Sequence, residues 1–92
     1  MNVFVLHESN NLYGVFTDLE KANSRIWDIS RKALLASLDD GERVRSFRIV
    51  MDRFNDDQMI VFAVCEIRHA MGEAWTEYHK RVCIISQYEV TE

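Results

Sequence analysis

The residues best suited to hold a metal ion form two mirrored pairs with the same spacing: Cys65 and His69, then His79 and Cys83. Zinc requires its four ligands within about 2.0–2.3 Å of the ion. Residues four positions apart lie about 6 Å from each other on a helix but roughly 13 Å apart along a strand. Both segments have the composition of strands, so one ion cannot reach all four side chains. We therefore expect two free thiols in the core and no metal site.

The ingredients of nucleophilic catalysis occur in this chain only as separate residues. The nearest approach to an acid–base pair is His7 followed by Glu8, and adjacent residues of a strand point to opposite faces. The sequence contains no nucleophile elbow and no glycine-rich phosphate loop. It therefore predicts a protein that is not an enzyme. A small enzyme or metal protein that uses the two Cys–His pairs is the alternative, and elemental analysis would reveal bound zinc.

Acidic residues gather in two segments that the sequence places in loops. One group follows the predicted helix and the other occupies a turn: Asp39, Asp40 and Glu42, then Asp56 and Asp57. The segment around the second group lacks the alternating spacing of a calcium-binding loop. The acidic segments are therefore either solvated loops or a negative surface that meets a basic partner. Trp75 and Tyr78 are of the aromatic types enriched at binding hot spots, and they complete the candidate partner-binding residues.

Length and composition narrow the classes of function. The chain has 92 residues, of which 48% are hydrophobic and 28% are charged, as in a single globular domain spanning residues 1–92. The 11 basic and 15 acidic residues give a net charge of −4, whereas nucleic-acid binding requires a cationic surface. No apolar stretch approaches the roughly 20 residues of a membrane span. We expect a cytoplasmic protein with reduced thiols that binds neither nucleic acid nor membrane and carries no cofactor.

The N-terminal residues predict a β-hairpin. Two β-rich runs, residues 2–7 and 12–17, flank a polar turn at residues 8–11. Gly14 lies inside the second run, where a missing side chain indicates a bulge or a close approach by another element.

The next segment predicts an amphipathic helix of about 20 residues. Thr17 and Glu20 have the spacing of a capping box, with the threonine as the N-cap. Gly41 is placed to adopt the left-handed conformation past the helix C-terminus. The stripe expected to face the sheet has helical spacing, with Trp27 near its border: Leu19, Ala22, Ile26, Ile29 and Ala33.

The remaining residues predict three strands, 44–51, 59–67 and 75–90, with a turn at 55–57 and a loop at 70–74. The run 59–67 is almost continuously apolar, which is typical of a central, most buried strand. In the last hairpin we expect pairs that join opposite charges or like hydrophobes: Glu66 with Lys80, Val64 with Val82, and Phe62 with Ile84. The order β-β-α-β-β-β predicts an α+β fold, an antiparallel sheet of about five strands with one amphipathic helix packed on one face.

Both faces of the last hairpin are apolar, yet one helix covers only one face of a sheet. The helix-free face therefore needs another cover, which could be a second copy of the chain, another protein, or loops of the same chain. Edge strands offer a second route to a homodimer or a self-assembling module, because they readily pair with another chain.

The N-terminal third also resembles a known class of protein. The strand Val3–Leu6, a polar turn, and the segment Gly14–Ala22 (GVFTDLEKA) leading into a helix are similar to small phage-encoded proteins of unknown function. The shared segment covers less than a third of the chain and contains no catalytic residue. The resemblance implies a phage or prophage origin. It further implies an accessory protein that binds and inhibits a host protein or defence complex, in the manner of anti-CRISPR proteins.

Overall fold

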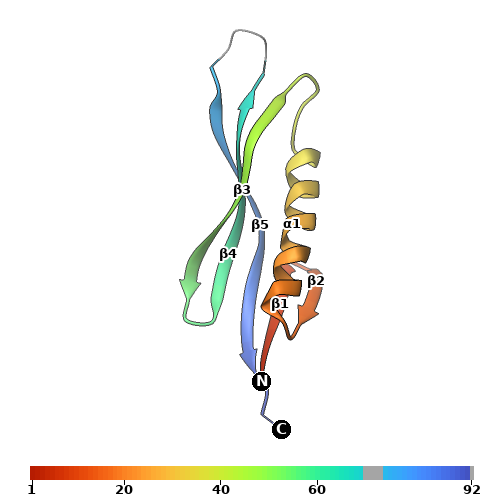
Figure 1. Ribbon diagram of the computed structural model, residues 1–92, viewed down its shortest axis with the longest axis vertical. Helices are drawn as coiled ribbons and strands as arrows, with labels where there is room; N and C mark the ends of the chain where they lie inside the picture. Colours follow the sequence, from red (N-terminus) through yellow and green to blue (C-terminus); the bar gives the residue numbers. More distant parts are fainter. Residues whose placement is uncertain (70–73, 92) are drawn as a thin grey trace.

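The computed structural model describes residues 1–69 and 74–91. It contains five strands and one helix: β1 (Asn2–Glu8), β2 (Asn11–Phe16), α1 (Leu19–Ala36), β3 (Arg43–Asn55), β4 (Gln58–Arg68) and β5 (Thr76–Glu89). All strand pairs are antiparallel, in one sheet of order β2-β1-β5-β4-β3. Figure 1 shows α1 lying along one face of this sheet. The predicted α+β fold is confirmed.

Gly14 makes a close contact inside the first hairpin. The register between β1 and β2 shifts after Leu6, so Tyr13 has no partner across the pair. A Cβ atom on Gly14 would lie 2.6 Å from the Phe16 ring, so the ring would have to shift to make room for a side chain. The predicted bulge is present beside Gly14, whereas the close contact comes from Phe16 of the same strand and not from another element.

The helix begins one residue later than the capping box predicted. Asp18, not Thr17, is the N-cap, and its side chain accepts a hydrogen bond from the Glu20 N–H at 2.8 Å. A carboxylate at this position also interacts favourably with the positive end of the helix dipole. The helix ends at Ala36, well before Gly41. Gly41 does have a positive φ of 86°, but it serves in the loop that precedes β3.

The core lies between α1 and the sheet face that it covers. The helix buries Ala22, Ile26 and Ile29 as predicted, and the sheet contributes fully buried side chains from three strands: Leu6, Val61, Ala63, Cys65 and Cys83.

Three further helix positions show where the predicted stripe ends. Leu19 is 49% exposed, so its predicted burial is wrong. The first turn of α1 extends beyond the edge of the core. Ala33 is only partly buried. Trp27 lies at the border, as predicted.

The centre of the sheet is β5 rather than the strand predicted there. β4 is the most buried strand, but β5 is long enough to pair with β4 and, through its C-terminal half, with β1. The two ends of the chain therefore lie in neighbouring strands, a long-range pairing that no local pattern indicates.

The register of the last hairpin also differs from the prediction. Glu66 lies opposite Glu77, and each carboxylate pairs with an arginine of β3: Glu66 with Arg45 at 3.4 Å, and Glu77, across β4, with Arg48 at 3.2 Å. Charge pairing across three strands therefore replaces the pairing expected across two. Three predicted pairs are wrong: Glu66–Lys80, Val64–Val82 and Phe62–Ile84.

The predicted turns have different outcomes. The turn between β3 and β4 is confirmed at Asp56 and Asp57, and Asn55 stabilises it by accepting a hydrogen bond from the Asp57 N–H at 2.9 Å. Of the predicted loop at 70–74, residues 70–73 lie outside the described residues. The one helix described is not long and apolar enough to cross a membrane.

Candidate protein-interaction surfaces

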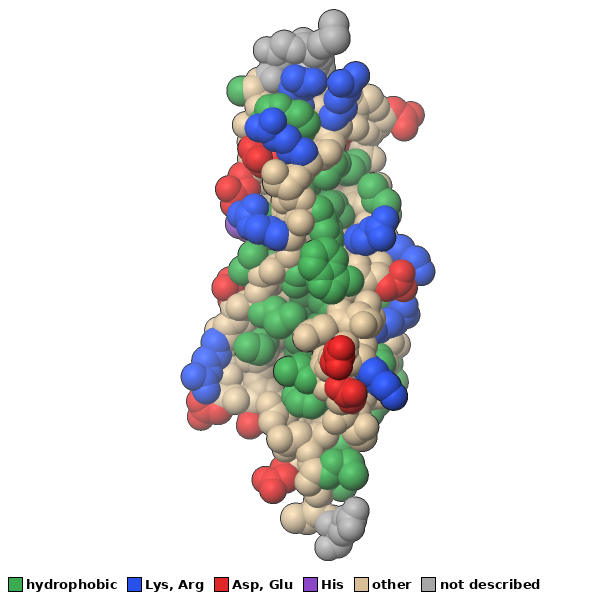
Figure 2. Space-filling model, viewed as in Figure 1, with side chains coloured by type: hydrophobic (Ala, Val, Ile, Leu, Met, Phe, Trp, Pro, Cys, Tyr) green, Lys and Arg blue, Asp and Glu red, His purple; other side chains and the backbone are tan. Residues whose placement is uncertain are grey.

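An apolar groove runs between α1 and the edge strand β3. At its end near the helix N-terminus it opens into a cavity of about 460 Å³. The apolar lining of this cavity comes from four strands and the first helical turn: Phe4, Leu19, Met51, Met59 and Ile85. Figure 2 shows hydrophobic side chains gathered in a stripe along the middle of this side of the molecule, with charged side chains on both borders.

The rim of the cavity is polar and includes the acidic turn. Asp56 and Asp57 line it, and Asp56 forms an ion pair with Arg53 at 3.3 Å. Asn23 lines the cavity from the helix, and its buried Oδ1 has no hydrogen-bond partner among the described residues. A buried acceptor without a partner is costly, so this oxygen is suited to accept a hydrogen bond from a bound segment.

The groove continues along the helix past the cavity. Trp27 packs on Phe47 of β3, with ring centroids 5.3 Å apart, and Trp27 remains 47% exposed. Smaller hollows of about 200 and 180 Å³ lie on either side of this pair. The aromatic pair thus bridges the helix and β3 without closing the gap between them.

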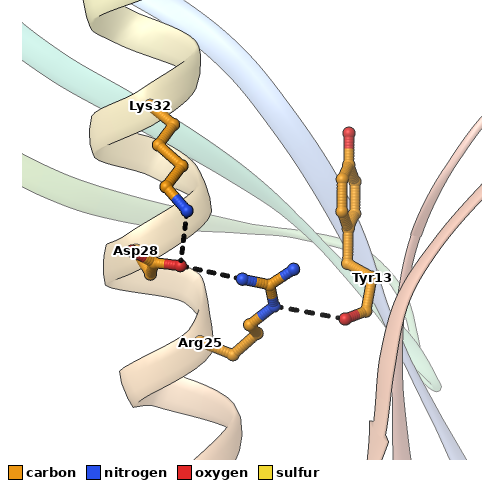
Figure 3. A network of polar contacts seen from close by, with 4 residues as sticks. All are labelled: Tyr13, Arg25, Asp28 and Lys32. Carbon is orange, nitrogen blue, oxygen red and sulfur yellow. Dashed lines mark hydrogen bonds and ion pairs between the residues drawn. The ribbon is translucent and has the colours of Figure 1, made fainter.

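Polar contacts cross the opposite flank of α1, beside a hollow of about 350 Å³. Arg25 donates a hydrogen bond to the Tyr13 carbonyl oxygen at 3.3 Å and forms an ion pair with Asp28 at 2.8 Å. Lys32 contacts the same carboxylate at 3.3 Å. Figure 3 shows the Arg25 guanidinium reaching from the helix to β2 through this network.

The helix-free face of the sheet carries a second apolar surface. The strand registers place five residues in one row across all five strands: Asp52, Ile60, Ile84, His7 and Leu12. Rows above and below add further apolar side chains on the same face. We call this surface the open apolar face, and its apolar members are Val5, Leu12, Val15, Val50, Ile60, Phe62, Ile84 and Tyr88.

The rest of the helix-free face, toward the start of β5, is charged. Its ion pairs include Arg45–Glu66 and Arg48–Glu77. His79 donates a hydrogen bond to Glu77 at 2.6 Å, and this bond, with help from Arg48, lowers the pKa of the Glu77 carboxyl. The charged part of the face is therefore largely neutralised within the chain.

Trp75 lies at the charged end of this face. Its ring is held between two guanidinium groups, with Arg45 4.1 Å and Arg68 4.9 Å from the ring centroid. Such cation–π contacts stabilise an aromatic ring near solvent. Trp75 remains partly exposed and available for contact beside the loop.

Tyr78 lies on the other face of the sheet from Trp75. It packs against the core, opposite Cys65, and its hydroxyl donates to the Ser37 Oγ at 3.3 Å. The structure therefore does not bring the two predicted aromatic residues together.

The predicted acidic residues also separate. Asp39 and Asp40 are exposed at the start of β3, whereas Asp56 and Asp57 follow its end, roughly 40 Å away along 13 residues of strand. The two loops therefore do not form one patch.

Glu42 differs from the other acidic residues because its side chain is only 5% exposed. It accepts a hydrogen bond from the Asp39 N–H and contacts His69 at 2.9 Å. These bonds give it a structural part in the loop.

The two thiols are free and buried on the helix side of the sheet, as predicted. Burial raises the pKa of Cys65, and it raises the pKa of Cys83 to about 12. His79 lies on the opposite face from both cysteines, because its partner in the register is Val64 of the helix-free face. The four side chains of the mirrored Cys–His pairs are therefore not gathered, and no cluster of metal-binding residues occurs within residues 1–69 and 74–91.

Sequence reasoning missed the groove. Met51 and Met59 lie close to either end of the β3–β4 turn, and Leu19 looked like an ordinary core position of the helix. A weak signal was present in the two methionines, since flexible thioether side chains are common at adaptable binding surfaces.

Comparison of this chain with protein-family models, with curated proteins and with solved structures finds no match in any of the three.

Proposed function

We propose that this protein is a non-enzymatic protein-binding module, a phage accessory protein that binds and inhibits a host protein or defence complex in the host cytoplasm. The observation that carries the proposal is the cavity of about 460 Å³ between α1 and the β3–β4 hairpin. The segment that resembles phage-encoded proteins, residues 14–22, contains Leu19, which forms part of the wall of this cavity.

The lining of the cavity indicates the chemistry of the partner. Its apolar floor is suited to one or two aliphatic or aromatic side chains. Asp56 is paired with Arg53 at this rim, so Asp57 is the carboxylate that favours a neighbouring lysine or arginine. The partner segment that fits is therefore apolar with a flanking basic residue, and one of its N–H groups would bond to the Asn23 oxygen.

The same lining supports a binding role rather than a catalytic one. Among the described residues, those around the cavity include no cysteine, histidine or serine. The thiols lie elsewhere and have raised pKa values because they are buried, whereas a reactive cysteine needs a lowered pKa.

Capture of a host protein by two cavity variants tests the proposal. Leu19→Glu and Met59→Glu each place a charge in the apolar floor at a partly exposed position, so the fold should persist. We expect each variant to retain less than about a tenth of the captured protein, because a buried unpaired charge is costly. The matched control is Val90→Glu, which changes a 45% exposed residue that lines none of the cavities described.

The readout is affinity capture on the tagged protein from bacterial lysate, followed by mass spectrometry and a purified binding assay. A host protein retained by the unchanged chain and by the control, but lost from both cavity variants, supports the proposal. Equal capture by all four proteins would contradict it. Asp57→Asn should weaken binding less and reduce its dependence on ionic strength.

A further inference from the structure

We propose that the open apolar face binds the same face of a second copy of this chain, forming a two-fold symmetric dimer in which two sheets pack face to face and the helices lie outside. This surface is on the opposite side of the sheet from the groove. The dimer therefore leaves the cavity accessible, and the two proposals can fail separately.

Exposure of the face indicates that it needs a cover. Leu12, Val15 and Tyr88 are 66%, 56% and 55% exposed. The row of Leu12 continues through His7 into Ile84 and Ile60, and the row of Val15 continues through Val5 into Ser86. Scattered exposed hydrophobic residues are normal, but a contiguous apolar patch is not. Figure 1 shows no helix on this side of the sheet.

The size of the face matches a weak, reversible interface. Five strands about 4.8 Å apart are roughly 24 Å wide, and four rows of same-face residues extend about as far along the strands. The outer rows span fewer strands than the central one, so each copy contributes roughly 500 Å², or about 1,000 Å² in total, which lies below the roughly 1,200 Å² of stable interfaces and in the range of weak, reversible ones. We expect a dissociation constant in the micromolar range.

The polar groups within the face are already satisfied, so burying them requires no new partner. The Ser86 hydroxyl forms hydrogen bonds with His7 Nε2 at 2.7 Å and with Gln58 Nε2 at 2.9 Å. Ion pairs elsewhere on the face keep the charged residues beside β5 neutralised. The remaining charge in the central row is Asp52, which has no ion-pair partner among the described residues.

Charge decides between the two ways of placing the two-fold axis. An axis across the strands would put each Asp52 near the partner's Asp52, where like charges repel. An axis along the strands near Ile84 puts Asp52, at one end of the central row, near the partner's His7 and Leu12 at the other end. Both axes keep the strand directions of the two sheets aligned, as in other packed sheets, so the repulsion between the Asp52 carboxylates selects the second arrangement, which is the one we propose.

A second copy fits this face better than a different protein does. A two-fold interface needs a surface that is complementary to itself, and a nearly neutral apolar face meets that condition. The groove differs because its acidic rim favours a basic partner. The two surfaces therefore call for different occupants.

Sedimentation of the full chain across concentrations from about 1 to 200 μM tests the dimer. The unchanged protein should approach twice the chain mass of 10.8 kDa. Val15→Lys and Tyr88→Lys should each raise the dissociation constant at least about a hundredfold, because each buries a charge against an apolar surface. Both positions are more than half exposed in the single chain, so the monomer fold should persist, which circular dichroism checks.

The matched control is Leu35→Lys, at a position on α1 that is 62% exposed; it should leave the dissociation constant unchanged. A monomer throughout the concentration range overturns the proposal. Two other results also overturn the proposal: a dimer that Leu35→Lys disrupts, and a dimer that neither Val15→Lys nor Tyr88→Lys weakens. Either result would place the contact between the copies on the groove or on an edge strand. Capture of a host protein by Val15→Lys should be unaffected, which separates this test from that of the proposed function.

Discussion

Along the flank that faces β2, α1 is tied to the sheet by a polar network, whereas along the flank that faces β3 it lies beside an open apolar groove. Arg25 reaches the Tyr13 carbonyl on the first flank (Figure 3), and Trp27 rests on Phe47 on the second. The difference follows from the sheet order, since one helix about 10 Å wide cannot cover five strands. The β3 side of α1 is therefore left uncovered.

The largest expected effect comes from the core beneath both flanks. Ile29→Ala should lower the free energy of unfolding by about 2–5 kcal/mol, because Ile29 is buried and its truncation leaves a cavity. Ile26→Asp should cost more, because it places an unpaired charge where the side chain is fully buried. Urea denaturation measures both. A loss below about half a kilocalorie for Ile29→Ala would mean that the helix does not bury this face.

The two thiols buried beneath the helix should be protected by the core from reaction with a thiol reagent. Cys65 and Cys83 should react slowly with a thiol reagent at pH 8 in the folded protein and rapidly in urea, because burial raises both pKa values. Fast labelling of the folded chain would contradict their placement.

The raised pKa of Cys83 also predicts a pH dependence. The unfolded chain releases this proton near the ordinary pKa of 9.0, whereas the folded chain holds it up to about 12. The contribution of Cys83 to stability is therefore lost as pH rises through this window. Comparison with Cys83→Ala isolates the effect, since that variant should lose less stability between pH 9 and 12.

On the groove flank, Trp27→Ala should cost about 1–3 kcal/mol. The substitution removes the contact with Phe47 together with the buried half of the indole. Leu35→Ala, at an exposed position on the same flank, should cost less than about half a kilocalorie. The same denaturation experiment checks both, and equal losses would mean that the aromatic pair does not hold this flank.

On the polar flank, Arg25→Ala should cost less than Trp27→Ala, below about 1 kcal/mol. The hydrogen bond to Tyr13 and the ion pair with Asp28 are partly exposed, and such contacts contribute little net stability. The loss should shrink further at high salt. A cost larger than that of Trp27→Ala would reverse the comparison between the two flanks.

Local sequence patterns accounted for most of the elements but not for their pairing. The capping signal at residues 17–20 located the helix start to within one residue, and the turn at 55–57 was correct. The register of the last hairpin was wrong, because it depended on Arg45 and Arg48 of a third strand. A rule that pairs charges between two strands cannot account for arginines of a third strand whose position is not known from the sequence.

The candidate site was predicted less well than the fold, and for the same reason. The aromatic types of Trp75 and Tyr78 were visible in the sequence, but the pleat sends them to opposite faces. The cavity combines Phe4, Leu19 and Met59, which are far apart in the chain. The spacing of residues along the sequence does not indicate which distant residues come into contact in the fold.

The sequence by itself determined the periodicities of the helix and the strands, the β3–β4 turn and the burial of both thiols, because each depends on neighbours within a few residues or on side-chain polarity. Only the tertiary structure decided that β5 lies at the centre, that Leu19 overhangs the core, and that the β3 side of the helix stays open. These features depend on contacts between distant segments. The free energy of each such contact depends on which surfaces pack together, and the whole fold determines that packing.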